Sequence, residues 1–194
     1  FFTVREILKS YRAEEIRYFI LASHYRSPLN YSQENLESGK AALTRLYSTL
    51  RGLVPAASAD DSCEGYYDAF NKAMDDDFNT PEAIAVLFDL AREINKHKQD
   101  QPQTANLLAG CLYELGGILG LLQVDPEIFL RDMAPGQTDT PGALSSEAVE
   151  ELIARRLQAR TEKDWAQADR IRDELDAAGI ILEDGASGTR WRRS

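Results

Sequence analysis

The residues best suited to chemistry are Trp165 and Asp169, which stand four positions apart near the C-terminus. Residues at this spacing in a helix are neighbours on one face. An indole face can stack a nucleobase, and a carboxylate beside it can accept hydrogen bonds from the amino or imino groups of a base edge. The pair could therefore recognise an unpaired base.

Trp165 and Asp169 could instead stabilise the fold and have no part in base recognition. A helix is predicted over 164–178, and its apolar stripe consists of Ala168, Ile171, Leu175 and Ala178. Trp165 lies about 100° and Asp169 about 140° from the centre of this stripe, at about 100° per residue. Trp165 could pack under the C-terminal tail while Asp169 pairs with an arginine, and the pattern alone favours this alternative.

Arginines accompany the pair. Arg156 and Arg160 fall on the apolar stripe of a preceding helix, predicted over 147–161, whose other members are Val149, Leu152, Ile153 and Leu157. Their guanidinium groups suit the negative end of the helix dipole, and they could also contact a phosphate or stack on a base. The run from Arg190 to Arg193 is either a solvated basic tail or, as we expect, a segment that closes the small C-terminal domain and supplies positive charge.

No catalytic constellation is visible. The sequence has no Gly-rich phosphate loop and no metal-spaced set of His and Cys. Cys63 and Cys111 are 48 positions apart, so we expect reduced thiols rather than a zinc site. Asp75-Asp76-Asp77 could suggest a metal site, but capping carboxylates between two helices are favoured. We predict no catalytic residue and no metal site in this chain.

The elements that must position these residues are mainly helices. Capping signals and helical spacing predict helices near or over 4–11, 13–23, 32–53, 63–74, 80–98, 103–122 and 125–131. Long amphipathic helices with short connections favour an antiparallel helical bundle. Beyond a Pro- and Gly-rich linker at 132–146, two helices and two short strands, 180–182 and 189–192, predict a small α/β C-terminal domain.

Composition fits a globular protein but argues against non-specific binding of nucleic acid. Of 194 residues, 43% are hydrophobic, and the net charge is −10. The charge is uneven, since residues 145–194 hold nine Lys and Arg against eleven Asp and Glu. No apolar run is long enough to span a membrane, and no secretory signal is visible. The chain begins with Phe, so we expect a piece of a longer protein.

Several motifs, in order and in register, resemble the cysteinyl-tRNA synthetase family along essentially the whole chain. They are Phe-Phe-Thr-Val-Arg-Glu (1–6), His-Tyr-Arg-Ser-Pro-Leu-Asn-Tyr-Ser (24–32), Met-Asp-Asp-Asp-Phe-Asn-Thr-Pro-Glu-Ala (74–83), Leu-Gly-Leu-Leu (119–122), Lys-Asp-Trp (163–165), Ala-Asp (168–169), Arg-Asp (172–173), Gly-Ile-Ile-Leu-Glu-Asp-Gly (179–185) and Gly-Thr-Arg-Trp-Arg-Arg (188–193). Arg190 is a minor departure, because the family more often has Thr there.

The resemblance implies the C-terminal part of a class I enzyme that joins cysteine to tRNA(Cys) using ATP. It implies a stem-contact segment (1–31), a helical bundle of the class I anticodon-binding type (32–131), the linker (132–146) and an anticodon-binding domain (147–194). ATP and zinc would belong to the parent enzyme, whose catalytic domain we expect to be absent here, so this chain alone should be inactive. The parent would be a monomeric, cytoplasmic protein without membrane contact.

The same resemblance implies which residues meet the anticodon. The positions that match the family's anticodon readers are Arg160, Trp165, Asp169 and Asp184. They would meet a GCA anticodon loop, Trp165 by stacking and the carboxylates by accepting hydrogen bonds from guanine or cytosine. Which residue reads which base stays open.

Two alternatives compete with this interpretation. A related cysteine-adding ligase of mycothiol synthesis shares the bundle but needs no anticodon reader, and the full set of motifs from Trp165 to Arg193 argues against it. A helical protein-interaction module would explain the acidic bundle and the lack of catalytic residues, and it would bind no RNA.

Overall fold

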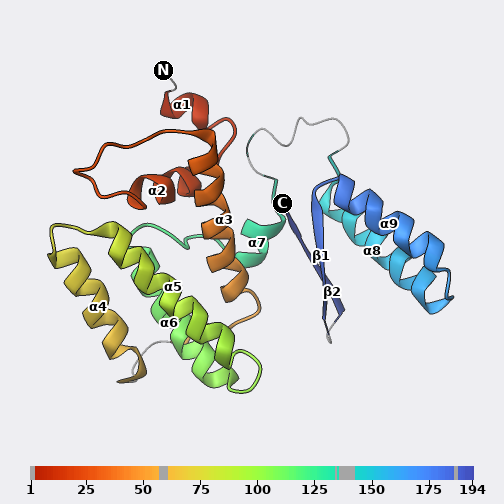
Figure 1. Ribbon diagram of the computed structural model, residues 1–194. Coiled ribbons are helices and arrows are strands. Elements are labelled where there is room, and N and C mark those ends of the chain that lie inside the picture. Colours follow the sequence, from red (N-terminus) through yellow and green to blue (C-terminus); the bar gives the residue numbers. More distant parts are fainter. Residues whose placement is uncertain (1–2, 57–60, 134, 136–142, 186–187) are drawn as a thin grey trace. The chain divides into compact units, whose positions relative to one another are not determined.

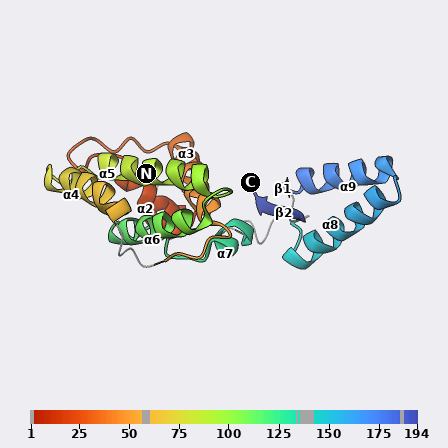
Figure 2. The same ribbon diagram turned by 90° about the horizontal axis from the view of Figure 1, so that it is seen from below.

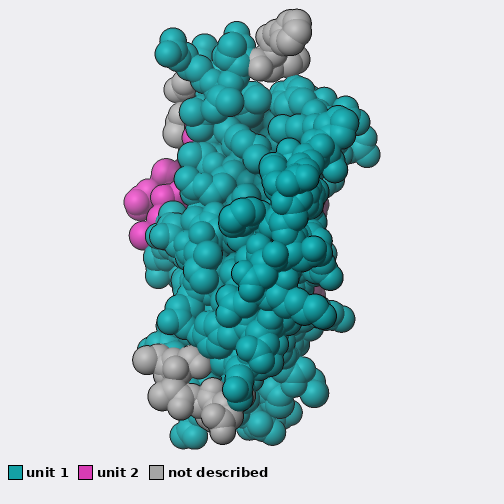
Figure 3. Space-filling view, turned by 90° about the vertical axis from the view of Figure 1, so that its left-hand side faces the viewer, with its two compact units in different colours: residues 1–127 teal, residues 128–194 magenta. Residues whose placement is uncertain are grey.

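The computed structural model describes residues 3–56, 61–133, 135, 143–185 and 188–194. By its internal contacts the chain divides into two compact units, Phe1–Glu127 and Ile128–Ser194, which are coloured separately in Figure 3. Most of the predicted linker at 132–146 lies outside the described residues. None of the described helices is long and apolar enough to cross a membrane.

The first unit is built from helices, which Figure 1 shows in chain order. The helices are α1 (Val4–Ile7), α2 (Ala13–Leu21), α3 (Gln33–Leu50), the 3₁₀ turn η1 (Asp61–Cys63), α4 (Glu64–Asp75), α5 (Thr80–His97), α6 (Pro102–Ile118) and α7 (Pro126–Arg131), whose last residues belong to the second unit. The prediction of a mainly α fold with a helical bundle is confirmed.

Local signals start these helices where the sequence predicted. Thr3 and Glu6 form a capping box at α1, and the Ser32 hydroxyl accepts a hydrogen bond from the backbone N–H of Asn35 at α3. Asn79 caps α5 in the same way, with Pro81 in the first turn. Each cap satisfies a backbone donor that has no partner within the helix.

Apolar stripes hold the helices together. Helix α5 packs against α4, α6 and α3, and α2 packs against α3. The two views in Figures 1 and 2 show α5 running beside α6. The fully buried side chains of this core include Leu36, Leu43, Leu46, Leu50, Leu87, Leu90, Ile94, Leu112 and Leu115.

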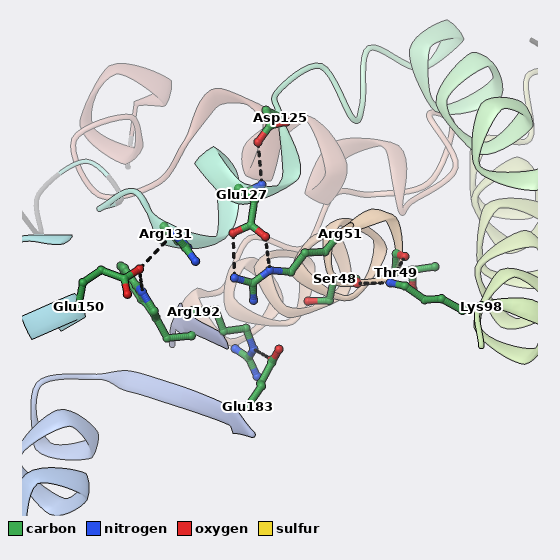
Figure 4. Close-up of polar contacts among 11 residues, drawn as sticks. Ser48, Thr49, Arg51, Lys98, Asp125, Glu127, Arg131, Glu150, Glu183 and Arg192 are labelled. Atoms are coloured by element: carbon green, nitrogen blue, oxygen red, sulfur yellow. Dashed lines mark hydrogen bonds and ion pairs between the residues drawn. The ribbon is translucent and has the colours of Figure 1, made fainter. Parts of the chain in front are cut away.

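Two positively charged side chains form contacts at the C-terminal end of α3 (Figure 4). Lys98 Nζ donates to the backbone carbonyl of Thr49 at 2.8 Å, where the helix dipole is negative. Arg51, which is 3% exposed, donates to both carboxylate oxygens of Glu127 at 2.7 and 2.8 Å. These contacts tie the end of α3 to the chain that follows α5 and α6.

A buried carboxylate joins α2 to α3 and to the turn after α6. Glu14 accepts hydrogen bonds from the Tyr47 hydroxyl at 2.8 Å and from the backbone N–H of Leu122. Burial raises the pKa of Glu14 above its ordinary value of 4.5, although these hydrogen bonds and the nearby Arg17 and Arg12 act in the opposite direction. The folded state therefore binds the proton of this group more tightly than the unfolded state does.

Replacing Glu14 by glutamine is expected to change how stability depends on pH. Because the pKa is raised on folding, the stability that the protonated group contributes is lost as pH rises above 4.5 through the folded value. Glutamine carries no such penalty, so the variant should gain in free energy of unfolding relative to wild type as the pH rises above 4.5. Urea unfolding of both proteins across this range measures the difference, and a constant difference would contradict the prediction.

Candidate nucleic-acid interface

The second unit is a helical hairpin packed on a two-stranded sheet. Helices α8 (Ser146–Thr161) and α9 (Trp165–Ala177) contact each other and lie side by side in Figures 1 and 2. Strands β1 (Ile180–Gly185) and β2 (Gly188–Arg193) pair antiparallel, with Asp184 opposite Thr189 and Leu182 opposite Trp191. The core consists of Val149, Leu152, Ile171, Leu175, Ile180 and Trp191. The predicted small C-terminal α/β unit is confirmed.

Trp191 is the centre of this core. It is 0% exposed, and its Nε1 donates to Glu150 at 2.9 Å. The guanidinium groups of Arg131 and Arg193 lie 5.1 and 5.5 Å from its ring centroid, which is the range of cation–π contacts. Arg131 also pairs with Glu150, as Figure 4 shows. Arg193 therefore helps to close the unit, as expected for the run from Arg190 to Arg193, and is not part of a solvated tail.

A tight turn between α8 and α9 presents the start of α9. Lys163 adopts the left-handed conformation, with φ of 61°, and the backbone N–H of Asp164 donates to the carbonyl of Ala159 at 2.8 Å. The Asp164 carboxylate then caps α9 by accepting from the backbone N–H of Gln167 at 3.0 Å. Trp165 is thus the first residue of a capped helix.

Replacing Lys163 by glycine is expected to stabilise the second unit. A side chain in the left-handed region costs about 1–2 kcal/mol, while glycine loses about 0.5–1 kcal/mol of extra backbone freedom on folding. The free energy of unfolding should therefore rise by about 0.5–1 kcal/mol, measured by urea denaturation. Lys163→Ala, which keeps a Cβ at this φ, is the matched control and should give no such gain.

Trp165 and Asp169 are both on the surface. The Trp165 side chain is 59% exposed, and Asp169 is exposed one turn further along α9. The alternative in which Trp165 packs under the C-terminal tail is wrong, because more than half of Trp165 is accessible to solvent. Asp169 forms no ion pair with any residue that the structure describes, so the expected arginine partner is absent there.

Two arginines of α8 contact the Asp184 carboxylate. Arg156 donates to Oδ1 and Oδ2 at 3.1 and 2.9 Å, and Arg160 approaches Oδ2 at 3.5 Å. The Thr189 hydroxyl donates to Oδ1 at 2.6 Å. The hydrogen bonds from Arg156 and Thr189 hold the pKa of Asp184 well below its usual range, so this half-exposed carboxylate is ionised at neutral pH.

The buried face of α8 differs from the predicted stripe at its C-terminal end. Leu157 is 61% exposed, whereas Arg156 is only 8% exposed. The helical pattern placed both on one face, but Arg156 lies inward, where it pairs with Asp184, and Leu157 lies in solvent. Arg156 is therefore the contact that sequence reasoning missed, since its partner lies 28 positions away in the chain.

Several other cations of this unit remain exposed. Among the described residues, none forms an ion pair with the side chains of Arg155, Lys163, Arg170, Arg172 and Arg190. Such groups can neutralise phosphates, which is the main source of affinity for nucleic acid. The unit thus offers exposed positive charge although the whole chain carries −10.

Three segments of the chain match known protein families. Residues 144–192 match the family described as the cysteinyl-tRNA ligase anticodon binding domain, and residues 69–123 match the DALR domain. Residues 1–41, which include the expected stem-contact segment, match the class I (C) catalytic domain of tRNA synthetases, so a short piece of that domain is present where the sequence analysis expected none. The chain belongs to the cysteinyl-tRNA synthetase family. It corresponds to the C-terminal portion of these enzymes, as the motifs predicted.

Individual relatives agree with the family models. A cysteine–tRNA ligase of Methylococcus capsulatus is 58% identical over 196 residues, which cover 100% of this chain and 41% of that protein. The cysteine–tRNA ligases of Thioalkalivibrio sulfidiphilus and Idiomarina loihiensis are 58% and 52% identical, each over 100% of this chain and 40% of its own length. The chain spans about two fifths of the length of the curated relatives it matches.

Proposed function

We propose that this chain is the tRNA-binding part of a cysteine–tRNA ligase, which attaches cysteine to tRNA(Cys) using ATP. In this proposal residues 1–31 contact the stem, residues 32–131 form the bundle domain, and residues 147–194 bind the anticodon loop. The full-length ligase is proposed to be a cytoplasmic monomer. The chain alone is proposed to be inactive.

We propose Arg160, Trp165, Asp169 and Asp184 as the residues that meet the anticodon. The observation that carries the proposal is the exposed indole of Trp165 at the start of α9, within a segment that matches an anticodon-binding family. Stacking of a base on an exposed indole contributes roughly 1–3 kcal/mol and tolerates any base. Sequence selection then falls to the polar groups, because hydrogen bonds to base edges distinguish one base from another.

ATP and zinc belong to the proposal for the full-length ligase only. Among the described residues, no group of three or more His, Cys, Asp or Glu side chains could hold a metal ion. Cys63 and Cys111 are buried, and burial raises the pKa of the Cys111 thiol, which opposes formation of a metal-binding thiolate. Zinc and ATP therefore enter this proposal only through the full-length ligase.

A direct titration tests the proposal. The 194-residue chain is titrated with an RNA hairpin that carries the anticodon stem-loop of tRNA(Cys), and then with hairpins altered at one anticodon position each. We expect saturable binding of the first hairpin and weaker binding of the altered ones. Equal binding of all hairpins, or no binding, would overturn anticodon recognition.

The protein-interaction alternative has one observation in its favour. A hollow of about 970 Å³ between α4 and α5 is lined by acidic side chains, among them Asp68, Asp75, Asp76, Glu82 and Asp89. An acidic hollow suits a basic protein segment better than RNA. The same titration separates the two functions, because an interaction module predicts no response to the anticodon sequence.

A further inference from the structure

The Asp184 carboxylate is held from one side only. Arg156 reaches it from α8 and is 10% exposed at its side chain, whereas the Asp184 side chain is 47% exposed. Thr189 reaches it from the paired position on β2. The two donors therefore fix the carboxylate from within the unit and leave its outer side in solvent.

One acceptor position of the Asp184 carboxylate is not used by any short hydrogen bond. An ionised carboxylate offers about four lone-pair positions, two on each oxygen. On Oδ1 both positions are used, by Arg156 at 3.1 Å and by Thr189 at 2.6 Å. On Oδ2 one is used by Arg156 at 2.9 Å, and the other faces Arg160 at 3.5 Å. The last contact is longer than an ordinary N–H···O hydrogen bond.

We propose that Arg156 and Thr189 are positioning residues, which hold Asp184 so that one acceptor position on Oδ2 receives a single N–H donor of an anticodon base. In the free protein the exposed Arg160 covers this position. When RNA binds, an exocyclic amino or ring imino group takes the place of Arg160, whose guanidinium is then free to contact a phosphate. This inference rests on the proposed function, and it names the chemistry that Asp184 selects.

The charge of Asp184 contributes to the selection of a base donor, as does the direction of its open acceptor position. A base donor that meets an ionised carboxylate forms a charge-assisted hydrogen bond, about twice as strong as a neutral one. The hydrogen bonds from Arg156 and Thr189 keep Asp184 ionised, since they hold its pKa well below its usual range. A base that presents an acceptor at this position would meet like partial charges, so the arrangement rejects it. Fixing three of the four positions thus turns a general acceptor into a selective one.

A purely structural role for Arg156 makes a different prediction. If Arg156 only stabilised the fold, its loss would weaken the binding of every RNA hairpin to the same extent. A positioning role instead removes discrimination at one anticodon position, the same position that Asp184→Asn affects. Discrimination at each position, rather than overall affinity, is therefore the measurement that separates the two roles.

The experiment uses the 194-residue chain and the set of hairpins altered singly at the three anticodon positions. Asp184→Asn identifies the position that Asp184 reads. Thr189→Val removes one donor with little change of shape, and Arg156→Lys keeps the charge but loses the paired hydrogen bonds. We expect Thr189→Val and Arg156→Lys each to lose roughly 10- to 100-fold of discrimination at that position and to retain discrimination at the other two. This loss corresponds to one hydrogen bond to a charged group.

Arg192→Lys is the matched control, because Arg192 pairs with Glu183 at 3.2 Å on the same two strands. It should leave discrimination unchanged at all three positions. Uniform weakening across the hairpins, or full discrimination by Thr189→Val and Arg156→Lys, would overturn the positioning role while the proposed function stands. If the wild type itself does not discriminate, both the proposed function and this inference fall.

Discussion

Replacing Trp191 by alanine is expected to unfold the second unit. The side chain is fully buried among α8, α9 and the sheet, and it also anchors Arg131, Arg193 and Glu150. Truncating a buried tryptophan to alanine costs about 3–5 kcal/mol, because the loss of apolar contacts is joined by the cavity left behind. That loss is comparable with the whole stability of a small domain.

Circular dichroism and urea denaturation measure this loss. Trp191→Phe is the control, since it keeps an aromatic ring but removes the Nε1 donor to Glu150, a contact worth about 1.5–3 kcal/mol with a charged acceptor. Its unfolding midpoint should lie between those of the wild type and Trp191→Ala. An unchanged midpoint for Trp191→Ala would show that the unit does not depend on this core.

The second large effect is expected at the other tryptophan and on a different property. Trp165→Ala should weaken binding of the anticodon stem-loop roughly 10- to 100-fold, through loss of one base-stacking contact worth roughly 1–3 kcal/mol. The free energy of unfolding should change by less than about 0.5 kcal/mol, as is usual for an exposed side chain. Titration of the hairpin and urea denaturation of the same sample measure the two quantities.

Two further variants sharpen this test. Trp165→Phe keeps a flat aromatic face, so it should recover most of the affinity. Ile118→Ala removes a side chain that is 63% exposed on α6, close to the 59% of Trp165, and it should leave hairpin binding unchanged. Unfolding of Trp165→Ala, or hairpin binding equal to that of wild type, would remove Trp165 from the proposed interface.

The helical pattern alone could not decide which of the two tryptophans is buried. By pattern, Trp165 stands beside the apolar stripe of α9 and Trp191 stands within a run of arginines, so the first could have been core and the second solvated. The structure reverses this, with Trp191 at 0% and Trp165 at 59% exposed. A run of arginines can surround a core residue when they stack on its ring or turn to backbone carbonyls, as Arg193 does.

For the candidate site as well, the sequence and the structure supplied different information. Its four residues were named from the sequence by resemblance, and their role in RNA binding stays a prediction. The exposure of Trp165 and Asp169 and the link between Arg160 and Asp184 came from the structure. Arg156 was seen only as an arginine on an apolar stripe, because its partner is on a strand that the helical pattern does not describe.

The sequence by itself determined the elements and the family. Helix caps, such as Ser32 and Asn79, and apolar spacing at helical period act between residues three or four apart, so they can be recognised without knowledge of the fold. The tertiary structure alone decided which side chains of the second unit are buried and which meet. Those contacts, from Arg156 to Asp184 and from Glu150 to Trp191, join residues 28 and 41 positions apart, and only packing of α8 on the sheet brings them within hydrogen-bond distance.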